Sequence, residues 1–198
     1  GLSGVQLLQY GRDAFAARLA LADATERCLD VQYYMWKPDD SGRLLLEKLV
    51  QAANRGVRVR LLLDDMGGSA SDDDLLALSQ HTNIEVRLFN PVASRSFRYL
   101  SIAFDFRRIT RRMHNKSFTA DKLVTILGGR NVEDRYFAVG DEASQFADFD
   151  VLAAGPVAGE VAGMFDRYWY SDSSIPIQAL NRKHLSPEQL AQSFSRLT

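Results

Sequence analysis

The amino-acid sequence predicts a domain of the α/β class with a parallel sheet. Apolar residues at helical spacing alternate with β-branched and aromatic runs between residues 11 and 89. The 198 residues suit one domain, of ordinary or large size. Hydrophobic residues make up 46% of the chain and charged residues 25%, which is typical of soluble globular proteins and excludes a disordered or collagen-like chain.

Spacing and turn residues predict the first two helices and the strand between them. Residues 11–28 repeat apolar side chains at helical intervals, and residues 29–36 are aromatic and β-branched, as in a buried or half-buried strand. Residues 44–54 predict a second helix, which we expect Ser41 to cap. This helix ends before Gly56, a residue suited to the left-handed conformation that follows many helices.

A second unit repeats this order. Residues 57–63 change from alternation to a continuous apolar run, which favours a strand covered on both faces. Ser71 and the three aspartates after it suit the start of a helix that reaches about His81, because the helix dipole favours acids there. Residues 84–89 predict the next strand. Strands joined by helices at this spacing favour parallel pairing with right-handed crossovers.

The pattern changes after residue 91. Residues 114–120 and 123–127 predict two strands joined by a short, hairpin-like turn. Residues 149–154 predict a further strand. Pro156 then suits the first position of a helix that ends near Tyr170, because its missing N–H costs nothing there.

Charge and cysteine content exclude several kinds of site. The net charge is −1, so the whole chain has no polyanion-binding character, although residues 95–116 hold six Arg and one Lys against one acid. A single cysteine, Cys28, excludes an intramolecular disulfide framework and a thiolate-rich metal site. We expect neither a metal nor another cofactor, since the three histidines are far apart in sequence: His81, His114 and His184. The longest apolar runs are shorter than the roughly 18–20 residues that span a bilayer.

One short stretch carries a candidate phosphate site. On a strand, His114 and Lys116 would share a face, because side chains alternate. Gly128 and Gly129 would let the backbone approach a ligand and leave N–H groups for an anion. Lys116 would neutralise charge, Asn131 would donate to an oxygen, and His114 could attack phosphorus as a neutral imidazole. A solvated or core histidine beside an ordinary Gly-Gly turn is the alternative interpretation.

The spacing His-x-Lys-x(4)-Asp-x(6)-Gly-Gly-x-Asn resembles the HKD motif of the phospholipase D superfamily, and the resemblance extends over residues 1–172. Val-Gln-Tyr-Tyr-Met-Trp at 31–36 is similar to the bacterial cardiolipin synthase branch. Arg-Arg-Met-His-Asn-Lys at 111–116, with Gly-Gly-Arg-Asn at 128–131, most resembles its C-type enzymes. The resemblance implies an α/β/α sandwich with a mixed, largely parallel sheet, forming one lobe of a bilobed fold.

The resemblance also implies a role for each motif residue. His114 would be the nucleophile, or the leaving-group acid, of a phosphohistidine mechanism. Lys116 and Asn131 would bind the phosphate, together with the backbone of the two glycines. Asp121 belongs to the motif, and we expect a structural role in which it pairs with basic groups at the end of the strand.

In the family, an acid orients the histidine. Asp148 precedes Gly155-Pro156 by the interval of seven residues that the resemblance implies. A carboxylate on the second imidazole nitrogen would fix the tautomer and stabilise the imidazolium. Glu142 and Asp150 are competing candidates, and all three could instead be surface acids near the start of a strand.

Two departures from the family pattern bear on function. Gly129 stands where the family often has Ser, and the sequence contains one HKD motif where family enzymes assemble a site from two. We therefore expect residues 1–172 to be the first lobe alone and residues 173–198 to be a connector. A second HKD lobe would come from the chain's own C-terminal half or from a homodimer partner.

The resemblance implies phosphatidyl transfer between phospholipids, as in cardiolipin synthesis. Anionic and zwitterionic phospholipids would then be partners, and the protein would associate peripherally with the bacterial inner membrane. The alternatives are phosphodiester hydrolysis, as a phospholipase D or a single-motif homodimeric nuclease, and an inactive truncated lobe. The near-neutral charge of the chain does not favour nucleic acid.

A basic segment runs directly into the motif. We expect its arginines to meet an anionic membrane, at about 1 kcal/mol for each basic residue near the surface: Arg107, Arg108, Arg111 and Arg112. A solvated basic segment is the alternative.

Overall fold

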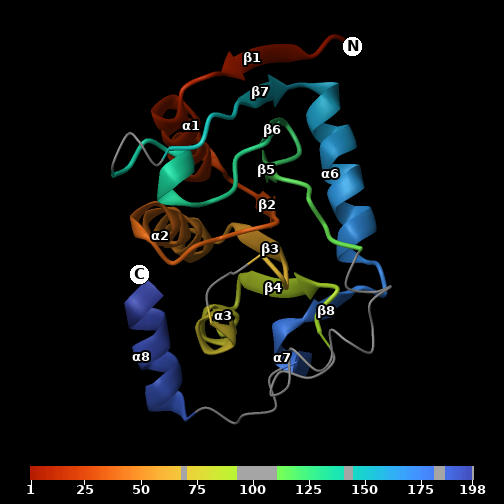
Figure 1. Cartoon of the computed structure of the whole chain (residues 1–198). Helices are drawn as coiled ribbons and strands as arrows, with labels where there is room; N and C mark the ends of the chain where they lie inside the picture. The colour runs from red at the N-terminus through yellow and green to blue at the C-terminus, as the bar shows by residue number, and fades with distance from the viewer. Residues whose placement is uncertain (68–70, 93–110, 141–144, 181–185, 198) are drawn as a thin grey trace.

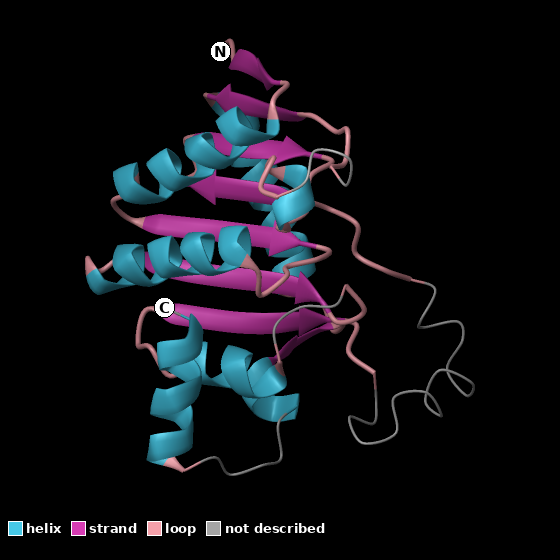
Figure 2. Ribbon diagram, turned by 60° about the vertical axis from the view of Figure 1, so that its left-hand side comes forward, coloured by secondary structure: helices cyan, strands magenta, loops and turns pink. Residues whose placement is uncertain are grey.

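The computed structural model describes residues 1–67, 71–92, 111–140, 145–180 and 186–197. Within these residues, eight strands form one sheet in the order β1-β7-β6-β5-β2-β3-β4-β8. Helices cover both faces of this sheet (Figure 1 and Figure 2). The domain is therefore an α/β sandwich with a mixed sheet, which confirms the predicted fold class.

The centre of the sheet is parallel. The three strands β2 (Cys28–Tyr33), β3 (Arg58–Asp64) and β4 (Ile84–Phe89) pair in parallel, and the helices α2 (Asp40–Asn54) and α3 (Asp72–Leu78) connect them. Most side chains of β2 and β3 are buried, as expected for strands covered on both faces. These two units match the elements predicted from periodicity to within a few residues.

The other described neighbours in the sheet are antiparallel, so the expectation of a largely parallel sheet is wrong. From β2 outward, each strand is antiparallel to the one before it, in the order β5 (Ser117–Ala120), β6 (Val124–Gly128), β7 (Asp150–Ala154) and β1 (Gly4–Leu8). The turn after β5 accounts for the pairing of β5 with β6, because two successive residues with positive φ reverse the chain there, as in the favoured hairpin turns.

Both edge strands were absent from the sequence prediction. The strand β1 pairs with β7, and β8 (Ser174–Pro176) pairs with β4. Beyond β8, α7 (Ile177–Leu180) and α8 (Pro187–Leu197) follow, and α8 packs against α3. The described residues after 172 thus pack on the domain, and their role as a connector stays a prediction.

The helices α1 (Gly11–Ala24) and α2 lie on one face of the sheet, and α6 (Pro156–Trp169) lies on the other (Figure 1). Pro156 occupies the start of α6, as predicted. Gly56 follows α2 with a φ of 93°, a conformation that glycine adopts without strain.

The predicted start of α3 at Ser71 agrees with the structure, whereas the predicted cap of α2 is wrong. Ser71 accepts a hydrogen bond from the N–H of Asp74. At α2 the cap is Asp39, whose carboxylate accepts from the N–H of Gly42. Ser41 lies two residues after the cap, within the first turn, and its N–H donates to the carboxylate of Asp134, outside the helix.

Candidate active site

The motif segments meet at one end of the sheet. In the strand register Gln32 pairs with Ser117, Ser117 pairs with Leu127, and Gly128 pairs with Asp150. The start of β5, the end of β6 and the start of β7 therefore lie beside the carboxyl end of β2. This brings together three segments that are distant in sequence: His114–Lys116, Gly128–Asn131 and Asp148–Asp150.

His114 and Lys116 lie just before β5, not within it, which corrects their predicted placement on a strand. The preceding residue, Met113, donates its N–H to Asp64 at 2.8 Å, so the chain is held at the end of β3 before it enters the sheet. Both motif side chains nevertheless contact one aromatic ring. The His114 ring centroid lies 5.1 Å from that of Tyr34, and Lys116 Nζ lies 5.8 Å from the Tyr34 centroid.

Lys116 is a buried cation with unused donors. Its side chain is 6% exposed, and Nζ donates to the carbonyl of His114 at 2.8 Å, its one described hydrogen bond. An ammonium has three N–H donors, so among the described residues two stay available to a ligand. Burial lowers the pKa of Lys116, and the negative charges of Asp148 and Asp150 raise it in part. An anion is the ligand that such a cation favours.

Asn131 is held firmly beside the same loop. Its Oδ1 accepts the N–H of Met35 at 3.1 Å, and its Nδ2 lies 3.3 Å from the hydroxyl of Tyr136. The side chain is nearly buried, at 4% exposed. The second N–H of the amide group is the one that could reach a phosphate oxygen.

Gly128 and Gly129 allow Asp150 and Asp148 to pack closely against the backbone at the end of β6. A Cβ on Gly128 would lie 2.6 Å from the Cα of Asp150, and a Cβ on Gly129 would lie 2.1 Å from Oδ1 of Asp148. The N–H of Gly129 donates to the carbonyl of Phe149 at 3.2 Å. It is therefore not free for an anion, which corrects the prediction for this residue. The reason is that β7 runs close beside the end of β6.

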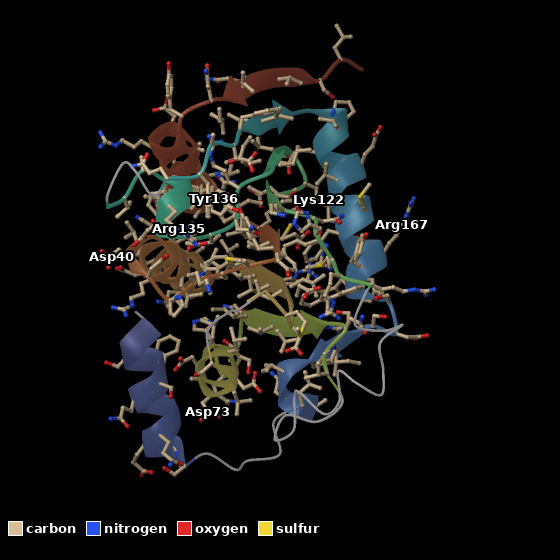
Figure 3. All side chains as sticks on the ribbon, viewed as in Figure 1. Asp40, Asp73, Lys122, Arg135, Tyr136 and Arg167 are labelled. Atoms are coloured by element: carbon tan, nitrogen blue, oxygen red, sulfur yellow. The ribbon has the colours of Figure 1, made fainter. Side chains whose placement is uncertain are left out.

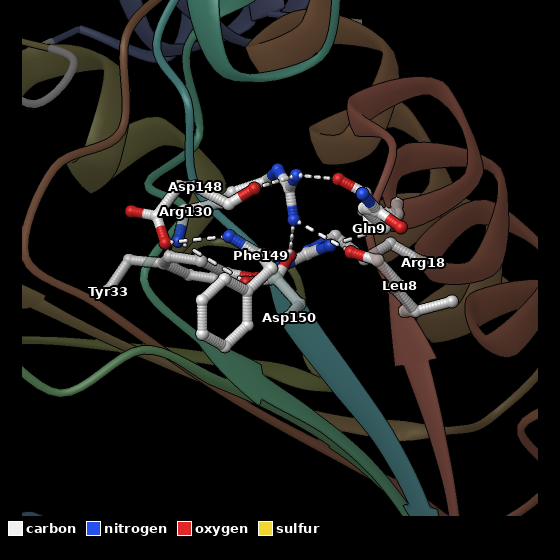
Figure 4. Close-up of polar contacts among 9 residues, drawn as sticks. Leu8, Gln9, Arg18, Tyr33, Arg130, Asp148, Phe149 and Asp150 are labelled. Carbon is white, nitrogen blue, oxygen red and sulfur yellow. Dashed lines mark hydrogen bonds and ion pairs between the residues drawn. The ribbon is translucent and has the colours of Figure 1, made fainter.

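The structure separates the candidates for the acid that orients His114. Asp150 is fully buried, with Oδ2 at 2.8 Å from Arg18 and 3.5 Å from Arg130, so its charge is used inside the fold (Figure 4). Glu142 lies outside the described residues. Asp148 is partly exposed, and its carboxylate accepts the N–H of Phe149 at 2.8 Å. Its predicted contact with His114 does not appear among the described hydrogen bonds, so this role stays a prediction.

Asp121 lies at the opposite end of β5. Its carboxylate accepts the N–H groups of Glu26, Arg27 and Cys28 at 3.0, 2.8 and 2.9 Å. Partial burial raises the pKa of Asp121, but these N–H groups outweigh it and hold the pKa below its usual value. The role that the geometry supports is structural, as expected, although the partners are backbone amides and not basic side chains.

The described part of the basic segment is tied to the sheet. Arg112 forms an ion pair with the buried Asp64 at 3.1 Å and donates to the carbonyl of Asn90 at 2.7 Å. This corrects its predicted approach to a membrane, because the guanidinium is committed to the ends of β3 and β4. Arg111 is exposed. Arg107 and Arg108 lie outside the described residues.

Sequence analysis did not identify Tyr34 or Tyr136 as site residues. Tyr34 was placed within an aromatic run typical of a strand, and Tyr136 follows the motif on a short 3₁₀ helix, Asp134–Tyr136. Figure 3 shows Tyr136 near α1 and α2, while Lys122, beyond Asp121, lies towards α6. Proximity of Tyr136 to the motif in sequence was the only available signal.

A cavity of about 840 Å³ lies next to the site. It is lined by residues from the start of α1 and from both sides of the motif's end, among them Tyr10, Arg12, Arg130, Tyr136, Phe146 and Asp148. His114 and Lys116 do not line it. Across the described ranges, no group of three His, Cys, Asp or Glu side chains could hold a metal ion. Within the same ranges, no helix is long and apolar enough to cross a membrane.

Residues 18–169 match the family described as "Cardiolipin synthase, PLD-like domain". The chain is 54% identical to cardiolipin synthase C of Escherichia coli K12 over 178 residues, which is 90% of this chain and 37% of that protein. It is 24% identical to cardiolipin synthase 1 of Bacillus cereus over 95% of this chain and 36% of that protein. The chain thus spans less than two-fifths of these relatives.

Two solved structures share the fold. Nuc of Salmonella typhimurium, a phospholipase D family member, has a TM-score of 0.60 at 15% identity, covering 88% of this chain and 98% of its own. Phosphatidylserine synthase of Haemophilus influenzae has a TM-score of 0.68 at 14% identity, covering 98% of this chain and 42% of its own.

Proposed function

Because the chain belongs to the cardiolipin synthase family of PLD-like domains, we propose that it forms one half of a phosphatidyltransferase site. The substrates are the phosphodiesters of anionic and zwitterionic phospholipids. The observation that carries this proposal is the pair of His114 and buried Lys116 on one aromatic ring, in a chain 54% identical to cardiolipin synthase C.

The transfer proceeds in two displacements at phosphorus. A ring nitrogen of His114 attacks the donor phosphodiester, a P–N bond forms, and the P–O bond to the leaving alcohol breaks. A second imidazole gives the leaving oxygen its proton, then takes the proton of the acceptor hydroxyl as that oxygen displaces His114. Lys116 balances the charge on the phosphoryl oxygens in both steps, and Asn131 donates to one of them.

The second imidazole comes from another HKD lobe. One motif supplies one histidine at this site, and each displacement needs both a nucleophile and an acid or base. The chain covers 37% of cardiolipin synthase C, which leaves room in such relatives for a second lobe. The partner is therefore a C-terminal half or a second copy of this chain. Peripheral contact with a membrane belongs to this proposal, since the substrates are lipids.

The test is formation of a new phosphodiester lipid from mixed phosphatidylglycerol and phosphatidylethanolamine vesicles, followed by mass spectrometry. The assay uses the chain alone and the chain combined with a second HKD lobe of the same family. We expect turnover only when two lobes pair. Substantial turnover by a verified monomer, linear in enzyme concentration, would overturn the half-site proposal. Products that carry water in place of a lipid alcohol would identify a hydrolase instead.

His114→Ala in the paired assembly should reduce turnover by more than the roughly 10²–10⁴-fold typical of a lost general acid or base, because no other group supplies the nucleophile. The matched control is His81→Ala, which removes a half-buried histidine whose ring is hydrogen-bonded to Asn54 and to the N–H of Asn83. The control should keep its rate within about twofold. A His114→Ala variant with more than about a tenth of the normal rate would exclude the phosphohistidine mechanism.

A further inference from the structure

The Tyr34 ring is shared by the two chemical groups of the motif. It lies tilted by 51° against the His114 imidazole, with the centroids 5.1 Å apart. The ammonium of Lys116 lies 5.8 Å from the centre of the same ring. The two motif residues also contact each other, since Lys116 Nζ donates to the carbonyl of His114. These three residues form one cluster, in which only Lys116 is buried.

The backbone on both sides of Tyr34 is fixed. Tyr33 ends β2, is fully buried, and its hydroxyl accepts from Nε of Arg18 at 2.8 Å. Met35 donates its N–H to Asn131 Oδ1 and accepts at its carbonyl the N–H of Val132, both at 3.1 Å. A residue held between two such anchors has little freedom to move its Cα.

The carbonyl of Tyr34 is also closely packed. A Cβ on Gly67 would lie 1.6 Å from the Tyr34 oxygen, so the loop after β3 presses its glycine against this peptide group. The ring of Tyr34 therefore projects from a rigid backbone. His114, in contrast, is exposed and precedes the strand, so its side chain has fewer buried neighbours to hold it.

We propose that Tyr34 is a positioning residue, whose ring holds the His114 imidazole and the Lys116 ammonium over a common phosphate. Attraction between the ring face and a cation is available to the charged form of either residue, the Lys116 ammonium or a protonated His114 imidazole. Through Met35, the same loop fixes Asn131, so one short connection after β2 orients all three groups. This inference rests on the proposed function.

A purely space-filling role for Tyr34 predicts something different. A ring that only fills volume can be replaced by Leu with little effect on His114, provided that the fold survives. A ring that positions the imidazole cannot be replaced by Leu without an effect on His114, whereas Phe, which keeps the ring, should serve as well as Tyr. Side-chain NMR of the chain labelled in histidine and tyrosine separates the two roles, because the sequence has three His and seven Tyr to resolve.

The experiment compares the unmodified chain with Tyr34→Phe, Tyr34→Leu and, as a control, Tyr10→Leu, which removes an exposed ring at the start of α1. In the unmodified chain we expect nuclear Overhauser contacts between the Tyr34 and His114 rings. Titration with inorganic phosphate should shift the His114 signals. Tyr34→Leu should move the free His114 signals and weaken phosphate binding by about two- to fivefold, the size of one cation–π contact. Tyr34→Phe and Tyr10→Leu should change neither.

The outcomes separate this inference from the proposed function. Absence of the Tyr34–His114 contacts in the unmodified chain would overturn the inference, and this measurement needs no variant to fold. Unchanged His114 signals and phosphate affinity in a folded Tyr34→Leu variant would overturn it as well. If the contacts are present but phosphate never shifts His114, the phosphate site itself is wrong and the proposed function fails with it. If His114→Ala removes turnover while Tyr34→Leu has no effect, the proposed function is supported and the positioning role of Tyr34 is overturned.

Discussion

Replacing Asp121 by Asn tests whether this motif acid supports the fold and not the phosphate. Its Oδ1 accepts the N–H groups of Arg27 and Cys28 at 2.8 and 2.9 Å, and its Oδ2 accepts that of Glu26 at 3.0 Å. The φ of Asp121 is 53°, a conformation that Asn adopts as readily as Asp. The substitution therefore removes charge and one acceptor without adding backbone strain.

The expected cost follows from these contacts. The Asn amide keeps one oxygen, which can still accept from Arg27 and Cys28, but its NH₂ group faces the N–H of Glu26. Hydrogen bonds to charged groups contribute about 1.5–3 kcal/mol each, and solvent at this partly exposed turn reduces that value. We expect the free energy of unfolding at pH 7 to fall by about 1–2 kcal/mol and Tm by about 2–8 °C.

The cost should depend on pH. Partial burial raises the pKa of Asp121, and the three backbone N–H groups lower it by more, so that it lies below its usual value in the folded chain. A lowered folded pKa stabilises the fold fully above the unfolded pKa of about 3.9, and this stabilisation disappears as pH falls through the folded value. The difference between the unmodified chain and Asp121→Asn should therefore shrink below about pH 4.

Urea unfolding followed by circular dichroism, at several pH values between 7 and 3, measures this difference. Asp172→Asn, which changes an exposed acid after α6, is the matched control and should stay within about 0.5 kcal/mol of the unmodified chain. An Asp121→Asn variant as stable as the unmodified chain at pH 7 would refute the reasoning. So would a deficit that stays the same size at every pH.

Four further substitutions probe the turn, the glycines and the buried ion pair. Lys122→Gly should raise the free energy of unfolding by about 0.5–1 kcal/mol in urea, because φ is 61° at this exposed residue and glycine relieves the strain; a loss would contradict this. Gly128→Ala should cost about 1–3 kcal/mol, since its Cβ would lie 2.6 Å from the Cα of Asp150 and the strands must shift. Gly129→Ala should lower the free energy of unfolding by less, because its Cβ would meet the side chain of Asp148, which can rotate away. A lower melting temperature for Gly129→Ala than for Gly128→Ala would contradict both expectations. Asp150→Ala should lower the free energy of unfolding by about 3–5 kcal/mol, because the buried charges of Arg18 and Arg130 would lose their carboxylate partner. A variant that melts within about 2 °C of the unmodified chain would argue against this role of the ion pairs.

Local signals predicted much of the fold. Helical and strand periodicity predicted α2, α3 and β4, and continuous apolar or aromatic runs predicted β2 and β3, because the residues of each element define which of its faces are buried. The edge strands β1 and β8 were not predicted. Their residues pair through the backbone at the rim of the sheet, where most side chains are exposed or half-buried and show no alternation.

The sequence by itself identified the motif residues of the candidate site, although not the tyrosines beside them. The motif was identified from the spacing of five residues: His114, Lys116, Asp121, Gly128 and Asn131. This spacing is visible in the sequence because the whole motif lies in one short segment around the hairpin of β5 and β6. The family match over residues 18–169 agrees with the family that this motif indicated, and the roles of the single residues stay predictions.

Only the tertiary structure decided how these residues are divided between chemistry and support. Asp121 is drawn away to the backbone of residues 26–28, and Asp150 and Arg112 are committed to buried ion pairs. Tyr34 reaches the site from the connection after β2, about eighty residues earlier in the chain. These outcomes depend on contacts between segments far apart in sequence, and the free energy of burying a charge or a ring is set by its neighbours in space.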